Sequence, residues 1–130
     1  MFQVEHVAWQ VNDPPAVAKW YVNTLGFRVL RKMDAAPFTH FLVDAGGRVV
    51  MEIYHNPVAS VPDYRSMNPL HLHLAFAVDQ PEAARAKLLE AGATNHEDAI
   101  ITPAGDKLIM LRDPFGFPIQ LCKRAKPMLG

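Results

Sequence analysis

An internal repeat constrains the fold of this chain more than any other feature of its sequence. The segment His6–Trp9 aligns with His73–Phe76 at an offset of 67 residues. Glu52 falls opposite Gln120 at an offset of 68, a slip of one residue that a single insertion explains. A duplicated supersecondary unit leaves a sheet face that it cannot bury by itself. The sequence therefore predicts one structural unit that occurs twice.

Each copy has the pattern of a strand, a helix and three further strands. Alternating apolar residues predict strands, and apolar residues at helical spacing predict a helix. A capping aspartate and a closing glycine mark each helix, Asp13 with Gly26 and Asp79 with Gly92. The expected strands cover residues 2–11, 27–32, 38–44 and 48–54, then 71–78, 94–101, 107–112 and 117–123; the helices cover 14–25 and 82–91.

We therefore expect an α+β fold of two tandem βαβββ modules whose mixed eight-stranded sheet surrounds a cleft. The 130 residues suit one domain. Within it we expect a first module at 1–54, a Pro- and Ser-containing linker at 55–70, a second module at 71–123 and a frayed basic tail at 124–130.

The composition excludes several classes of function. The chain has 13 Lys and Arg against 13 Asp and Glu, so it lacks the net positive charge that would attract nucleic acids or anionic membranes. Cys122 is the single cysteine, which rules out an internal disulfide. No apolar run approaches the roughly 20 residues of a membrane span, and the segment Met1–His6 does not have the pattern of a signal peptide. We expect a cytoplasmic protein that binds a small molecule.

Four polar residues interrupt apolar strands at positions that the repeat relates: His6, Glu52, His73 and Gln120. Strand alternation places them on the sheet face opposite the helices. If they converge, two imidazoles, one carboxylate and one amide oxygen would suit a divalent metal ion such as Zn, Ni, Co, Mn or Fe. A single strand histidine more often has a structural role, but four repeat-related positions favour a metal site.

Further residues are candidates for a substrate pocket. Gln10, Tyr54 and His71 share the phase of the four polar positions or lie next to them. Arg48, Arg65 and Lys107 are cations that could hold an anionic group, although nothing in the sequence brings them together.

These residues resemble the vicinal oxygen chelate superfamily, which groups glyoxalase I, bleomycin-resistance and fosfomycin-resistance proteins, methylmalonyl-CoA epimerase and extradiol dioxygenases. The resemblance covers nearly the whole chain. The Asp-Pro-x-Gly turn before the last strand is its most specific part. The segments that carry the resemblance are His6–Trp9, Trp20–Phe27, Glu52-Ile53, His73–Phe76 and Arg112–Leu121.

The resemblance implies metal ligands at His6, Glu52, His73 and Gln120. Gln120 departs from the glutamate of bacterial glyoxalase I, because an amide cannot take up a proton at neutral pH. The implied function is a metal-dependent lyase or isomerase that chelates its substrate through vicinal oxygens and stabilises an enediolate. Glu52 or metal-bound hydroxide would be the base.

Two alternatives stay open. One is a non-catalytic small-molecule binding protein of the resistance type. The other is an Fe(II) dioxygenase that uses His6, His73 and Glu52 as a two-histidine, one-carboxylate set. The resemblance also implies a homodimer, in some relatives with the cleft shared between subunits.

Overall fold

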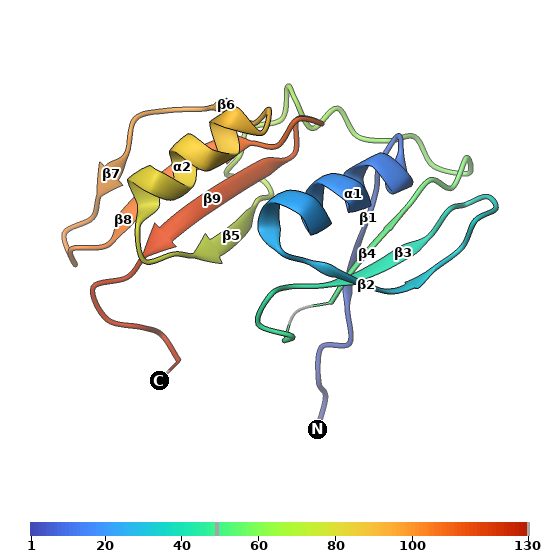
Figure 1. Cartoon of the computed structure of the whole chain (residues 1–130), viewed down its shortest axis with the longest axis horizontal. Helices are drawn as coiled ribbons and strands as arrows, with labels where there is room; N and C mark the ends of the chain where they lie inside the picture. The colour runs from blue at the N-terminus through green and yellow to red at the C-terminus, as the bar shows by residue number, and fades with distance from the viewer. Residues whose placement is uncertain (49, 130) are drawn as a thin grey trace. The chain divides into compact units, whose positions relative to one another are not determined.

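A computed structural model describes residues 1–48 and 50–129 (Figure 1). The chain forms two compact units, Met1–Pro62 and a second that begins at Asp63. Each unit runs strand, helix, strands, as the repeat predicts, so the α+β class and the tandem βαβββ pattern are confirmed. Among the described residues, no helix is long and apolar enough to cross a membrane.

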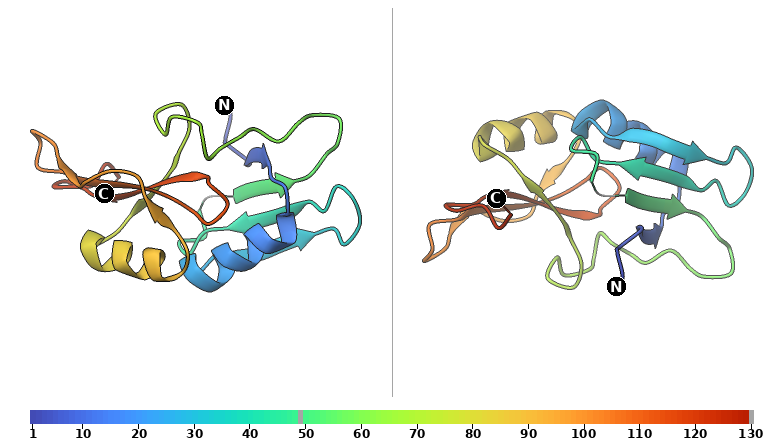
Figure 2. Two further views of the ribbon diagram at one scale, coloured as in Figure 1. Left: turned by 90° about the horizontal axis from the view of Figure 1, so that it is seen from above. Right: turned by 90° about the horizontal axis from the view of Figure 1, so that it is seen from below.

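The first unit is a four-stranded sheet in the order β1-β4-β3-β2, with one helix on one of its faces (Figure 2). Strand β1 is parallel to β4, and the other neighbours are antiparallel. The elements are β1 (Val7–Gln10), α1 (Pro14–Leu25), β2 (Arg28–Lys32), β3 (His40–Val43) and β4 (Val50–Tyr54); residue 49 of the expected fourth strand lies outside the described residues.

Helix α1 begins and ends where its sequence predicts. The Asp13 carboxylate accepts the backbone N–H of Ala16 at 3.1 Å, and Gly26 takes a left-handed conformation with φ of 74°. Val17 and Tyr21 are buried on the inner face of the helix. The helix thus covers one face of the sheet and leaves the other to the site.

The second unit repeats this arrangement with one more strand. Its elements are β5 (Leu74–Ala77), α2 (Pro81–Glu90), β6 (Thr94–Asn95), β7 (Ile100–Ile101), β8 (Lys107–Arg112) and β9 (Pro118–Lys123). The sheet order is β5-β9-β8-β6, and β7 also pairs with β8. The expected strand at 94–101 is therefore two short strands on one partner, so the described residues contain nine strands rather than eight.

The first strand of each unit is shorter than the sequence predicts. Val7 pairs with Met51, next to the beginning of β4, so the residues before His6 lie beyond their partner strand. Leu74 pairs with Ile119, and the position before it faces Pro118, which has no N–H to donate. His6 and His73 therefore immediately precede their strands instead of lying within them.

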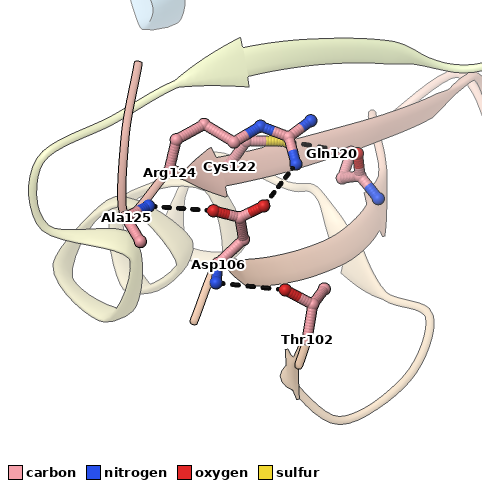
Figure 3. Close-up of polar contacts among 6 residues, drawn as sticks. All are labelled: Thr102, Asp106, Gln120, Cys122, Arg124 and Ala125. Carbon is pink, nitrogen blue, oxygen red and sulfur yellow. Dashed lines mark hydrogen bonds and ion pairs between the residues drawn. The ribbon is translucent and has the colours of Figure 1, made fainter. Parts of the chain in front are cut away.

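One local expectation in the second unit was wrong. Gln80, not Asp79, is the N-cap of α2, and its side chain makes no capping hydrogen bond. The tail is held at its beginning, because the Asp106 carboxylate accepts the backbone N–H of Ala125 at 2.8 Å and pairs with Arg124 at 3.0 Å (Figure 3). These contacts anchor the chain where it leaves β9.

Candidate metal and substrate site

The first unit brings together two of the predicted ligands, His6 and Glu52. The Nε2 atom of His6 lies 3.0 Å from the Oε2 atom of Glu52, and the two side chains are 34% and 20% exposed. They are 46 residues apart in the chain and meet because parallel pairing sets Ala8 opposite Glu52. This pair is on the sheet face that α1 does not cover.

Alternation along β4 explains why Glu52 has this orientation. Met51 and Ile53 are fully buried on the helix side of the sheet, with 1% and 0% exposure. Glu52 and Tyr54 are half-buried on the opposite side. The burial of Met51 and Ile53 on the helix side therefore sets the direction of the carboxylate between them.

The second ring nitrogen of His6 is also engaged. Its Nδ1 atom contacts the Glu5 carboxylate, and the ring forms a T-shaped contact with Phe41, with centroids 5.9 Å apart and an interplanar angle of 88°. The hydrogen bond to Glu5 raises the pKa of His6 above its usual value, against the lowering effect of burial, and the charges of Glu5 and Glu52 act in the same direction as the bond. A histidine held through Nδ1 by an oxygen presents Nε2 to a ligand.

The second unit repeats the register of the first. Ala75 lies opposite Gln120 in the parallel β5–β9 pair, as Ala8 lies opposite Glu52. Ile119 and Leu121 are buried, whereas Gln120 is half-buried on the alternate face. The predicted equivalence of Glu52 and Gln120 is therefore a true equivalence of position.

The amide of Gln120 has a partner on its own strand. Its Oε1 atom accepts a hydrogen bond from the Cys122 thiol at 3.2 Å, so the oxygen lies toward the thiol and the nitrogen away from it (Figure 3). Burial raises the pKa of the Cys122 thiol, which keeps it a neutral donor. A buried neutral thiol suits a positioning role better than that of a nucleophile.

His73 is held in the same manner as His6. Its Nδ1 atom lies 2.8 Å from the carbonyl oxygen of Pro69, and the side chain is half-buried. A backbone carbonyl on Nδ1 fixes the tautomer with a proton on that atom. The Nε2 atom, on the other side of the ring, is then directed away from the Pro69 carbonyl.

His6 Nε2 and Glu52 Oε2 form an ion pair at 3.0 Å. An imidazole nitrogen and a carboxylate oxygen are also donor types that a divalent transition-metal ion accepts. Across residues 1–48 and 50–129 no group of three His, Cys, Asp or Glu side chains is placed so that it could hold a metal ion, so the first unit supplies only a pair of candidate ligands.

The other predicted pocket residues differ in their placement. Tyr54 shares the face of Glu52. Gln10 is 8% exposed, and both ends of its amide bind the backbone of the following loop, at Asn56 and Ala59. These hydrogen bonds hold the first unit together, and a place for Gln10 in a substrate pocket stays a prediction. His71 lies in a turn before β5, where strand alternation with His73 does not apply.

Sequence reasoning missed a group of residues beside His6. Glu5, Leu30, Arg31 and Phe41 line a hollow of about 190 Å³ in the first unit. Phe41 lies opposite Glu52, and Arg31 lies opposite Phe41, so correct pairing of β2, β3 and β4 would have found them. Of the cations expected from the sequence, Arg65 donates to the Pro114 carbonyl instead.

Two βαβββ units with repeat-related histidines before their first strands define a glyoxalase-like protein. The chain belongs to the Glyoxalase/Bleomycin resistance protein/Dioxygenase superfamily, whose family model matches residues 3–121. This result confirms the family that the sequence motifs indicated.

Individual relatives support the same assignment. A solved glyoxalase family protein from Enterococcus faecalis is 30% identical, with a TM-score of 0.68 over 93% of this chain and 97% of that chain. A glyoxalase family protein from Bacillus cereus shares the fold with a TM-score of 0.78 over 97% and 96% of the two chains, at 14% identity. A catechol-2,3-dioxygenase of Bacillus subtilis is 33% identical over 106 residues, or 79% of this chain. The chain spans about a third (35%) of the length of that relative.

Proposed function

We propose that this chain is a metal-dependent enzyme that binds a small substrate through two vicinal oxygen atoms. The proposed ligands of the ion are His6, Glu52, His73 and Gln120. The observation that carries the proposal is the 3.0 Å approach of His6 Nε2 to Glu52 Oε2 on the sheet face that α1 does not cover. The Nδ1 contacts of both histidines support it, because metal-binding histidines ordinarily have such a partner.

The reaction we favour is that of a lyase or isomerase. A divalent ion would act there as a Lewis acid on a substrate carbonyl and stabilise an enediolate. Glu52 is the proposed base, since the amide of Gln120 cannot accept a proton at neutral pH. Its Oε2 atom faces His6, so Oε1 is the oxygen that would take a proton from the carbon beside the carbonyl.

A second candidate is a dioxygenase that opens a catechol ring. The similarity to a catechol-2,3-dioxygenase favours it, and so does the residue set, because two histidines and one carboxylate are typical of Fe(II) oxygenases. In that case His6, His73 and Glu52 would hold the iron. Gln120 would then remain hydrogen bonded to Cys122 and leave a coordination position to the substrate.

Metal content tests the site. The His73→Ala protein, purified without chelators, should lose bound metal while its circular dichroism spectrum stays close to that of the wild type. His71→Ala is the matched control, because this exposed histidine lies two residues away and should not affect metal content. Stoichiometric metal in His73→Ala would remove the residue from the site.

The reaction class needs a separate experiment. Protein loaded anaerobically with Fe(II), Ni, Co, Mn or Zn is offered catechol or a 2-hydroxy carbonyl compound. Oxygen consumption with catechol and Fe(II) would identify the dioxygenase. Solvent deuterium uptake beside the carbonyl, lost in Glu52→Gln, would identify the lyase or isomerase. Ligand binding that chelators do not affect, with no turnover, would favour a binding protein of the resistance type.

The assembly state belongs to the proposal as well. We propose a homodimer, which light scattering after size-exclusion chromatography would test. Cytoplasmic location stays a prediction, and fractionation of the source cells would check it.

A further inference from the structure

The hollow beside His6 combines an apolar wall with a cation. Its volume of about 190 Å³ is lined by Glu5, Leu30, Arg31 and Phe41, all of which belong to the first unit. A cavity of about 150 Å³ with apolar walls holds one benzene ring. The hollow therefore has room for a body of about the size of a single ring with a small substituent.

The sheet register aligns this hollow with the Glu52 carboxylate. Phe41 lies opposite Glu52, and Arg31 lies opposite Phe41, so the three residues form a row across β4, β3 and β2. Paired residues on neighbouring strands have side chains on the same face. Because neighbouring strands are about 4.8 Å apart, the backbone positions of Glu52 and Arg31 are about 10 Å apart. One ring-sized molecule spans such a distance between two side chains.

A β-bulge is responsible for the direction of Arg31. The pairing of β2 with β3 shifts between Val29 and Arg31, and Leu30 is the additional residue. Without the shift, Arg31 would lie opposite His40, which pairs with the buried Ile53 on the helix side. A bulge re-aims a side chain in this manner, and bulges are frequent beside active sites.

The charges beside the hollow favour an anion at Arg31. Within the described part of the chain no carboxylate forms an ion pair with Arg31, and its side chain is exposed. The Glu5 carboxylate is held by His6 instead. An arginine guanidinium binds a carboxylate through two parallel hydrogen bonds.

We propose that the hollow binds the carboxylate end of an organic acid the size of a single ring. The carboxylate pairs with Arg31, the apolar body lies against Phe41 and Leu30, and the opposite end faces His6 and Glu52. The subsite itself rests on the geometry of the first unit. The statement that this acid is the substrate rests on the proposed function, and its vicinal oxygens would then be at the end away from Arg31.

Binding measurements with three probes test the subsite. Calorimetry measures the binding of each probe. The compound 3,4-dihydroxybenzoate has both the carboxylate and the vicinal oxygens, catechol has only the oxygens, and benzoate has only the carboxylate. Arg31→Gln should weaken the binding of 3,4-dihydroxybenzoate by about 10- to 100-fold, as expected for loss of a hydrogen bond to a charged group. The affinity for catechol should stay unchanged. Arg28→Gln, on the same strand but opposite Val43, is the matched control and should change neither.

The outcomes separate this inference from the proposed function. Binding of benzoate to metal-free protein that depends on Arg31 would support the subsite even if no metal site exists. Metal-dependent binding of 3,4-dihydroxybenzoate that is equal in wild type and Arg31→Gln would overturn the subsite and leave the metal site intact. Failure of wild type to bind either carboxylate at millimolar concentration, with or without metal, would also overturn it.

Discussion

The turn before β9 contains a glycine that we expect to tolerate no side chain. Gly116 has φ of 90°, and a Cβ atom there would lie 2.9 Å from Cβ of Arg65 and 3.1 Å from its Cα and N. Those atoms are backbone or attached directly to it, so they cannot move aside as the end of a long side chain can. The Gly116→Ala change therefore tests how tightly the segment near Arg65 packs on the turn that leads to Gln120.

Gly105 provides a control in the same unit with almost the same backbone conformation. Its φ is 88°, and an added Cβ would meet only the Cβ of Ala125, at an ordinary 3.5 Å. Gly105→Ala should therefore cost only the left-handed strain of a residue with a Cβ, about 1–2 kcal/mol. Gly116→Ala should cost this amount and a further 1–3 kcal/mol or so for overpacking, about 2–5 kcal/mol in total.

Urea unfolding followed by circular dichroism measures the difference between the two variants. We expect the free energy of unfolding to fall about 1–3 kcal/mol further in Gly116→Ala than in Gly105→Ala. An equal loss in both would refute the reasoning, because it would mean that the segment near Arg65 yields at no cost. A change in the urea m-value in one variant alone would indicate a loss of two-state unfolding instead.

Three further changes test the second unit. Asp113→Ala should destabilise it by about 3–6 kcal/mol. The Asp113 carboxylate accepts hydrogen bonds from two backbone N–H groups of the turn at 2.9 Å, and each such bond contributes about 1.5–3 kcal/mol. An unchanged urea midpoint would contradict this. The backbone N–H of Ala125, with Arg124, holds the pKa of Asp106 below its usual 3.8, so its contribution to stability is present above that value and is lost as the pH falls through the lower folded pKa. Asp106→Asn should therefore reduce the fall in melting temperature between about pH 4 and pH 2, and an identical acid limb would count against this. Gln120→Glu should tighten Zn²⁺ binding by about tenfold, equivalent to about 1.4 kcal/mol, in competition with a chromogenic chelator; unchanged affinity would indicate that residue 120 is not a ligand.

Much of the candidate site could be predicted because its signal is local. The repeat of a histidine and of a polar residue about 46 residues later is visible in the sequence, although the sequence predicted both histidines to lie within their strands. Alternation assigns Glu52 and Gln120 a face. The structure confirms the register of this repeat, with Ala8 opposite Glu52 and Ala75 opposite Gln120. Assignment to the superfamily followed from the same residues, because the family motifs coincide with them.

Other features could not be predicted, because they depend on a partner far away in the chain. Gln10 is a polar residue in the phase expected of a pocket residue, yet its amide is hydrogen bonded to backbone groups 46 and 49 residues later in the chain. The Cys122 thiol orients the amide of Gln120, which the residue types alone do not show. Polar side chains satisfy whichever groups folding brings to them, and a linear pattern does not contain that information.

The sequence by itself determined the duplicated βαβββ plan, the helix ends at Asp13 and Gly26 and the chemical types of the proposed ligands, since propensity, capping and period act within a few residues. Only the tertiary structure decided where strands end and which side chains share a face, since both depend on the opposing strand. The bulge at Leu30 is the clearest case. One additional residue in β2 moves Arg31 from the helix side to the face of Glu52. The sequence around Leu30 and Arg31 does not indicate this shift.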